Sequence, residues 1–205
     1  MPRIRLLITL GVVVFARVAA AEPCGDATAL RTDLEQESIR ADRWNLAWRI
    51  IYTAGAVGQV AVAASGAADH DNTRALWVGG AKSSLAALGR WFSPLQIEVP
   101  PATGDACADR TALRAVAERA ARDERQEFWV SHLGSLVLNI GGAVVLAELT
   151  SWKTGLLSFA TGYPVGLLST YTMPRASWGR VREAAWTANV VATGSQYTLV
   201  VAGSF

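Results

Sequence analysis

Cys24-Gly-Asp-Ala-Thr-Ala-Leu-Arg31 recurs later in the chain as Cys107-Ala-Asp-Arg-Thr-Ala-Leu-Arg114, and the two stretches align without a gap. Further along, Glu35 of the first copy matches Glu118 of the second. Each copy continues in the same order, with a charged stretch, aromatic residues, a long uncharged run, a short polar break and another apolar segment. Such self-similarity is typical of a duplicated unit. It predicts two helical hairpins built on one plan.

A long helix is expected to begin each repeat. Asp26 and Asp109 follow the cysteines and are candidate N-caps, because a short side-chain oxygen can accept from the free amides of a first turn. No strong helix breaker follows until about Ala68 in the first copy and Leu149 in the second. At about 1.5 Å per residue, each helix would be about 60 Å long, twice the thickness of a bilayer core. The first half of each is charged and the second is not, which predicts a stalk that continues into a membrane span.

Four runs of the sequence are candidate membrane spans, since each approaches the roughly 20 residues that cross a bilayer. The second run is the least apolar because it contains Lys82 and Arg90. Tryptophans near the ends of the runs fit the preference of this side chain for the membrane–water interface. The runs are Ile50–Ala68, Ala75–Ile97, Phe128–Ala147 and Thr154–Met173, and the tryptophans are Trp44, Trp48, Trp77, Trp91, Trp129 and Trp152.

The N-terminal residues have the features of a secretory signal peptide. Arg3 and Arg5 precede the apolar stretch Leu6–Ala16, and small residues suited to cleavage follow at Val18–Ala21. An uncleaved anchor helix is the alternative, and both interpretations export the chain. In an oxidising compartment the default for two cysteines is a disulfide, so we expect Cys24 to pair with Cys107.

The predicted topology places both cysteines on one side of the membrane. With the mature N-terminus outside, the first and third spans enter the cell and the second and fourth return. We expect the inner membrane of a cell envelope, with the stalks and the C-terminus on the periplasmic side. The arginine distribution disagrees, because the inner turns hold only Arg74 and Lys153 although cytoplasmic loops usually concentrate basic residues. The predicted parts are a signal peptide (1–21), a first helical-hairpin repeat (22–106), a second (107–173) and a tail (174–205).

The tail differs in composition from the repeats. Arg175–Ala185 fits a short helix, and two segments rich in Val and Thr, Trp186–Ala192 and Tyr197–Ala202, flank a glycine-containing turn. This pattern favours a β-hairpin, and a fifth span is the alternative. The predicted fold class is therefore all-α: a duplicated helical hairpin forming a four-helix membrane bundle, with long helix extensions outside the membrane and a small C-terminal β-hairpin.

Small residues recur at four-residue spacing in the fourth run. Within lipid, a small face lets two helices approach closely, and hydroxyls can bond across it. We expect this face to pack inside one bundle, and homodimerisation is the alternative. Its members are Ser158, Gly162, Gly166 and Thr170.

The sequence offers little chemistry. The net charge of +2 gives no footprint for nucleic acid, and no catalytic motif such as G-x-S-x-G or H-E-x-x-H occurs. Asp69-His70-Asp71 lacks the spacing of a closed zinc site and fits a polar turn. We expect no enzyme activity, no cofactor and no metal.

Lys82 is the exception, because a charge within a span is costly and tends to face the bundle interior or a water-filled path. With Gln59 and Asn139 it could form an intramembrane polar cluster in a channel or transporter. The alternative is that Lys82 extends its ammonium group to the inner interface.

Two stretches near the C-terminus carry a resemblance. Ser158-Phe-Ala-Thr-Gly-Tyr-Pro-Val-Gly166 and Tyr171-Thr-Met-Pro-Arg175 resemble a pattern in uncharacterised exported proteins of proteobacteria. The resemblance covers about the last quarter of the chain and implies no activity.

These observations favour a non-catalytic envelope membrane protein, an anchoring or interaction module that presents its external stalks. The expected partners are the lipid bilayer and another envelope protein that contacts the charged stalks. A small channel or transporter and a soluble exported helical bundle are the alternatives.

Overall fold

A computed structural model describes Cys24 and residues 27–184, 186–193 and 196–203. The predicted signal peptide and the candidate cap Asp26 lie outside the described residues. Four long helices make up most of the described chain: α1 (Thr28–Ser65), α2 (His70–Phe92), α3 (Ala106–Leu149) and α4 (Trp152–Tyr171).

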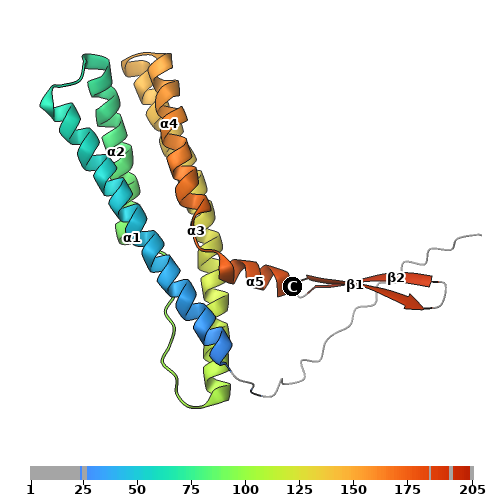
Figure 1. The fold of residues 1–205 in the computed structure, drawn as a ribbon. Coiled ribbons are helices and arrows are strands. Elements are labelled where there is room, and N and C mark those ends of the chain that lie inside the picture. The colour runs from blue at the N-terminus through green and yellow to red at the C-terminus, as the bar shows by residue number, and fades with distance from the viewer. Residues whose placement is uncertain (1–23, 25–26, 185, 194–195, 204–205) are drawn as a thin grey trace, which may run out of the picture.

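The four helices form two antiparallel hairpins. α1 packs along α2, and α3 packs along α4, while the contacts between the two hairpins are fewer. Both hairpin turns lie at one end of the molecule, and the disulfide lies at the other (Figure 1). The helical class and the pairwise packing of the helices are therefore confirmed.

The helix ends differ from the predicted ones for local reasons. α1 ends at Ser65 because Gly66 takes a left-handed conformation, with φ of 69°, that glycine adopts without steric cost. α3 begins at Ala106 because Asp105 caps it by accepting from the amides of Cys107 and Ala108. The expected N-cap Asp109 is wrong: its carboxylate lies inside the first turn and accepts instead from Thr103 at 2.9 Å.

The second predicted span is too long. α2 ends at Phe92, and the chain that follows continues beside the stalks toward the start of α3 (Figure 1). Leu95 and Ile97 are buried there, with 4% and 5% of their surface exposed. Asn45 holds this segment, since its amide donates to the Leu95 carbonyl at 2.7 Å and its carbonyl accepts from the Leu95 amide at 3.2 Å. Residues 93–97 therefore belong to the packing of the stalks rather than to a span.

The hydrophobic core lies in the stalk half of the molecule, where α1, α3, the 93–105 segment and the end of α4 meet. Its buried members are Leu34, Ala41, Trp44, Trp48, Leu95, Ile97, Leu113, Ala120, Phe128 and Met173.

Two tryptophans that were expected at a lipid interface belong to this core instead. Trp44 and Trp48 are 7% and 5% exposed. Each indole N–H donates to the end of α4: Trp44 to the Ser169 carbonyl at 3.2 Å and Trp48 to the Thr172 hydroxyl at 3.3 Å. Buried indoles usually find such a partner, so these two rings join α1 to α4.

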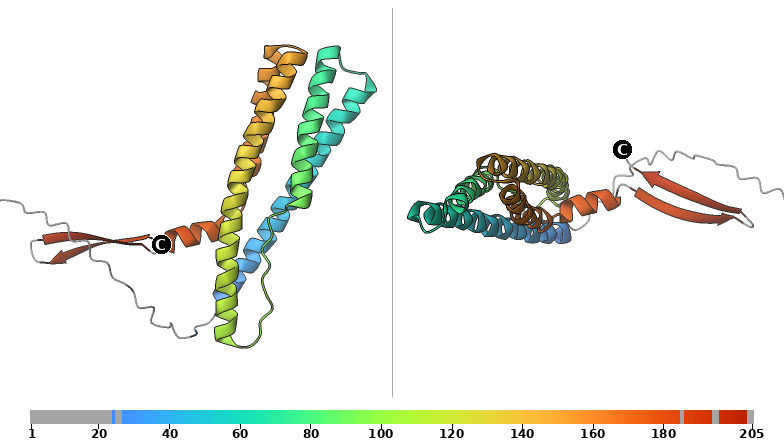
Figure 2. Two further views of the ribbon diagram at one scale, coloured as in Figure 1. Left: turned by 180° about the vertical axis from the view of Figure 1, so that it is seen from behind. Right: turned by 90° about the horizontal axis from the view of Figure 1, so that it is seen from above.

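The chain turns away from the bundle after α4. A short helix, α5 (Ala176–Ala184), packs on α3, and the strands β1 (Trp186–Thr193) and β2 (Gln196–Gly203) pair antiparallel. Figure 2 shows α5 leaving the side of the bundle.

The other half of each hairpin exposes apolar side chains. Val57, Val137 and Leu156 are 63%, 67% and 63% exposed. Two helices, α1 and α3, are long and apolar enough to cross a membrane by length and composition.

Candidate functional site

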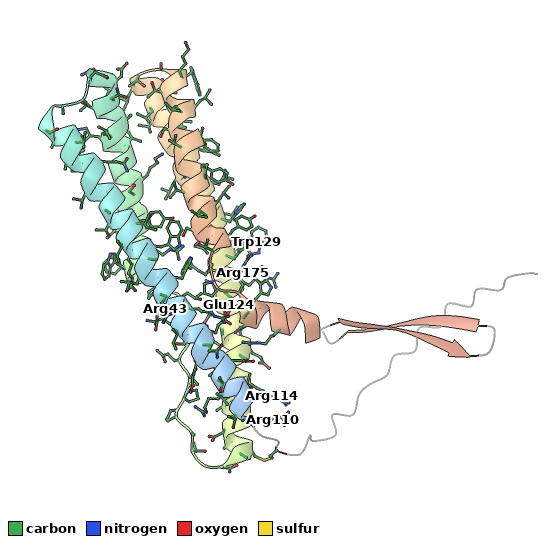
Figure 3. All side chains as sticks on the ribbon, in the orientation of Figure 1. Arg43, Arg110, Arg114, Glu124, Trp129 and Arg175 are labelled. Atoms are coloured by element: carbon green, nitrogen blue, oxygen red, sulfur yellow. A yellow bond between two sulfur atoms is a disulfide. The ribbon has the colours of Figure 1, made fainter. Side chains whose placement is uncertain are left out.

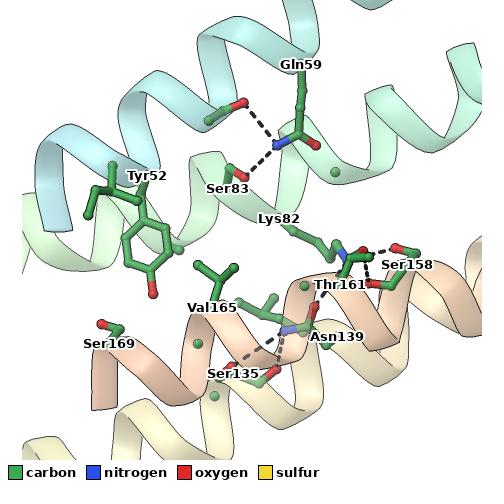
Figure 4. Close-up of a pocket in the computed structure, with 18 of the residues that line it drawn as sticks. Tyr52, Gln59, Lys82, Ser83, Ser135, Asn139, Ser158, Thr161, Val165 and Ser169 are labelled. Atoms are coloured by element: carbon green, nitrogen blue, oxygen red, sulfur yellow. Dashed lines mark hydrogen bonds between the residues drawn. The ribbon is translucent and has the colours of Figure 1, made fainter. Parts of the chain in front are cut away.

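A cavity of about 980 Å³ lies between the two hairpins and is lined by residues of α1, α2, α3 and α4. Figure 4 shows polar side chains from all four helices directed into it. They include Gln59, Lys82, Ser83, Ser135, Asn139 and Ser158.

Lys82 connects the first hairpin with the second. Its Nζ atom donates to the side-chain oxygen of Asn139 on α3 at 3.2 Å and to the hydroxyl of Ser158 on α4 at 3.0 Å. Asn139 is itself held, because its amide donates to the Ser135 carbonyl at 2.9 Å. The structure thus places Lys82 and Asn139 together, and the lysine head lies inside the bundle.

Two glycines make room for this contact. A Cβ atom at Gly142 would lie 2.6 Å from Cδ of Lys82, and one at Gly162 would overlap the side-chain oxygen of Asn139. Gly162 belongs to the predicted small-residue face. Gly142 was missed, because nothing in the local sequence shows that a lysine from another helix crosses over it.

Gln59 lines the same cavity, but its hydrogen bonds go to residues other than Lys82. Its amide donates to the Gly55 carbonyl at 3.0 Å and to the Ser83 hydroxyl at 3.2 Å, which ties α1 to α2. The absence of a side chain at Gly79 leaves the space that the Gln59 side chain occupies. The structure therefore places Gln59 in the first hairpin's own contact, apart from the Lys82 cluster.

The small residues of α4 contact both α3 and the cavity. Ser158 binds Lys82, Gly162 faces Asn139, and Gly166 lies against Ser135 so closely that a Cβ atom would overlap it. Thr170 is fully buried, and its hydroxyl donates to the Gly166 carbonyl at 2.9 Å.

The charge of Arg90, the second basic residue of the predicted second span, is compensated at the stalk end of the cavity. Its guanidinium pairs with Glu127 and donates to the Ser131 hydroxyl at 2.6 Å. The same group lies over the Trp44 ring, 4.4 Å from its centroid, where a cation is attracted to the π-face.

A second cluster of buried charged groups joins the stalks to α5. The Glu37 carboxylate on α1 accepts from the Ala176 amide at 3.0 Å, and the Glu124 carboxylate on α3 accepts from the Trp178 amide at 2.7 Å. Both glutamates are buried, with 2% and 0% of their surface exposed. Figure 3 shows Glu124 beside the start of α5. Carboxylates are favoured at this end of a helix because its free amides carry partial positive charge.

The pKa of Glu124 is raised to about 7, mainly because the carboxyl is buried and further because Glu37 lies nearby. The Trp178 amide opposes this rise. The sequence did carry a signal for both glutamates: they occur at three- and four-residue spacing with core residues, Glu37 with Leu34 and Ala41, and Glu124 with Ala120 and Phe128.

The predicted disulfide between Cys24 and Cys107 is present, with 4.9 Å between the Cα atoms. It joins the stalk ends of the two repeats. In the described part of the chain no group of three or more His, Cys, Asp or Glu residues could hold a metal ion. Asp69 instead caps α2 by accepting from the Asn72 amide at 2.9 Å.

The comparisons with known proteins add no assignment. No family model, no curated protein and no solved structure matches this chain.

Proposed function

We propose that this protein is a non-catalytic membrane protein of the cell envelope that anchors a rigid helical stalk outside the bilayer. In this arrangement all four long helices cross the membrane in their apolar halves. The disulfide end and α5 lie outside, and the hairpin turns lie inside.

One observation carries this proposal: the interior of the stalk half is apolar, whereas the interior of the other half is polar and its outer surface is apolar. In the stalk half, large apolar side chains such as Leu34 and Leu113 are fully buried. In the other half, Val57 and Val137 face outward while Lys82 and other polar groups face the interior. Polar groups turned inward and apolar groups turned outward reverse the usual order of a water-soluble protein. This arrangement suits a helix bundle that is surrounded by the hydrocarbon chains of a bilayer.

Three tethers hold the parts of the stalk together. The disulfide joins its ends, Asn45 holds the 93–105 segment, and Glu37 and Glu124 hold α5. A protein that only needed an anchor would not require such fixation. A stalk that presents a fixed surface to another envelope protein would.

The experiment is fractionation of a C-terminally tagged chain with an alkaline carbonate wash of the membranes. We expect the protein to remain in the pellet. Release into the wash would contradict the membrane placement and favour a soluble exported bundle. Crosslinking from the stalk surface, with arginine-to-glutamate variants at exposed positions as the control, then tests for a partner of the stalk.

The cavity around Lys82 favours a second candidate, transport of a small solute. The lysine bridges α2 to both helices of the second hairpin, so a path through the bundle would require these bonds to break. If the Lys82 ammonium is the group that binds the solute, replacing Lys82 by leucine should abolish any measured flux, and unchanged flux would exclude this role for the cavity.

A further inference from the structure

The charges that line the cavity do not balance. The charged residues in its lining are Lys82, Arg90 and Glu127. Arg90 and Glu127 pair with each other, whereas the hydrogen-bond acceptors of Lys82 are the neutral side chains of Asn139 and Ser158. Among the residues that the structure describes, the lining therefore carries one positive charge with no anionic group bonded to it. Lys82 is half-buried, and a charge taken partly out of water is stabilised by an oppositely charged partner.

The ammonium group of Lys82 has an N–H donor left for a further hydrogen bond. An ammonium group has three N–H donors, and two of them are used by Asn139 and Ser158. These two bonds also fix the position of Nζ within the cavity (Figure 4). A fixed cation with one free donor is suited to bind an anionic oxygen.

The rest of the wall suits an apolar body. Aliphatic side chains from all four helices line the cavity together with the polar cluster, and the volume of about 980 Å³ lies in the range of about 300–1,000 Å³ that is typical of small-molecule sites. These side chains are Ile51, Leu76, Val130, Leu138, Leu157 and Val165.

We propose that this cavity binds a long-chain carboxylate, with the carboxylate paired to Lys82 and the alkyl chain lying along the aliphatic side chains of the wall. The source of the ligand, the surrounding bilayer, rests on the membrane placement given above. The ligand site itself rests on the cavity and its charge.

The depth of Lys82 favours a carboxylate over a permanently charged head group. Lys82 is the thirteenth of the 23 residues of helix α2, near its midpoint, so the ammonium is far from both ends of the helix that is proposed to span the membrane. A carboxylic acid can reach this depth through lipid in its neutral, protonated form, since its ordinary pKa lies near 4–5. A phosphodiester stays charged over the same pH range. One lysine also matches the single charge of one carboxylate.

The test is saturation binding of radiolabelled hexadecanoate to the purified full-length protein in a non-ionic detergent. Unlabelled hexadecanoate, hexadecan-1-ol and hexadecyltrimethylammonium serve as competitors with the same chain and different heads. The variant is Lys82→Met, which keeps the length of the side chain and removes the charge. Lys153→Met is the matched control, because Lys82 and Lys153 are the two lysines of the sequence and Lys153 does not line the cavity.

We expect saturable binding in the wild type and at least tenfold weaker binding in Lys82→Met, because a hydrogen-bonded charge pair is lost. Lys153→Met should bind within twofold of the wild type, and hexadecan-1-ol should compete at least tenfold less well than hexadecanoate. Equal binding by Lys82→Met, or equal competition by the alcohol, would overturn the proposal. Where Lys82→Met does not fold, the competition series on the wild type decides alone.

This outcome is separate from that of the membrane fractionation. A protein that stays in the carbonate pellet but binds no hexadecanoate retains the anchoring function and loses the ligand site. A protein that washes free but binds hexadecanoate through Lys82 retains the site and loses the membrane placement.

Discussion

Glu124 shows how a single side chain couples the stalk to the rest of the molecule. It is fully buried, faces Glu37 and accepts the Trp178 amide at the start of α5. Burial without a cationic partner disfavours the charged form of a carboxyl. Because its pKa is raised to about 7, the Glu124 carboxyl is protonated in a large fraction of the molecules near neutral pH.

The pH dependence of stability follows from the sign of this shift. A proton bound more tightly in the folded state stabilises the fold below the ordinary pKa of 4.5, and this contribution is lost as the pH rises through about 7. We expect Glu124→Gln to gain stability relative to the wild type between pH 5 and pH 8, by a few degrees in the thermal midpoint at about 2–4 °C per kcal/mol. Thermal unfolding followed by circular dichroism at both pH values measures this. A constant difference between the two proteins would contradict it.

Gly166 tests the close approach of α4 to α3. A Cβ atom there would overlap the Ser135 side chain, and overpacking of this kind costs about 1–3 kcal/mol. Gly166→Ala should therefore lower the thermal midpoint of the purified protein by several degrees. Gly58→Ala is the control, since a Cβ atom at Gly58 meets nothing within 4 Å. Equal midpoints for the two variants would mean that the helices are not packed this closely.

The position of an individual side chain in the cavity could be predicted only where that residue is unusual for its stretch of sequence. Lys82 is unusual because it is a charge inside an apolar run, and Asn139 because it is an amide in another. The structure brings these two together and leaves Gln59 on a separate contact. Gly142 could not be identified, because its role depends on a side chain from a different helix.

At the scale of the elements, the long helices α1 and α3 each combine two environments. Their first halves pack in a stalk core and their second halves expose apolar faces. The change from charged to uncharged sequence made this division predictable. The ends of the helices were less predictable, since they depend on Gly66, Asp69 and Asp105, whose capping roles compete with those of other nearby candidates.

The disulfide is the strongest single constraint on the stalk. It closes a loop of 83 residues, and in the chain-entropy description a loop of this length stabilises the fold by roughly 4 kcal/mol. We expect the Cys24→Ser/Cys107→Ser double variant to become sensitive to trypsin in the stalks, with cleavage at arginines before residue 49 and between residues 107 and 127.

The apolar halves of the same double variant should remain resistant to trypsin, because they hold few basic residues and, in the proposed arrangement, lie in the membrane. Mass spectrometry of the digest identifies the cleavage sites. The matching control is the wild type treated with the same protease after mild reduction. Unchanged resistance of the stalks in both samples would show that the core around Leu34 and Leu113 is sufficient without the disulfide.

At the scale of the whole molecule, the repeated motif was the most informative part of the sequence. It predicted two hairpins and a pair of cysteines at one end, and the structure has both. The packing of residues 93–97 in the stalk core and the contacts that hold α5 were not predictable, because they depend on segments far apart in the chain, such as Asn45 with Leu95 and Glu124 with Trp178.

The arrangement of the whole molecule also constrains the proposed orientation in a membrane. The 93–105 segment and the disulfide lie at one end, and both hairpin turns lie at the other (Figure 1). If the helices cross the bilayer, the two turns must lie on the same side. The scarcity of basic residues in these turns makes this side worth measuring directly.

The most direct test is cysteine accessibility in intact spheroplasts, with one cysteine added per variant while the native disulfide is kept. Ala102→Cys marks the disulfide end, and Ala67→Cys and Lys153→Cys mark the two turns; all three positions are exposed. We predict that a membrane-impermeant maleimide labels Ala102→Cys before lysis and labels the other two only after lysis. Labelling of all three before lysis would contradict the four-span arrangement.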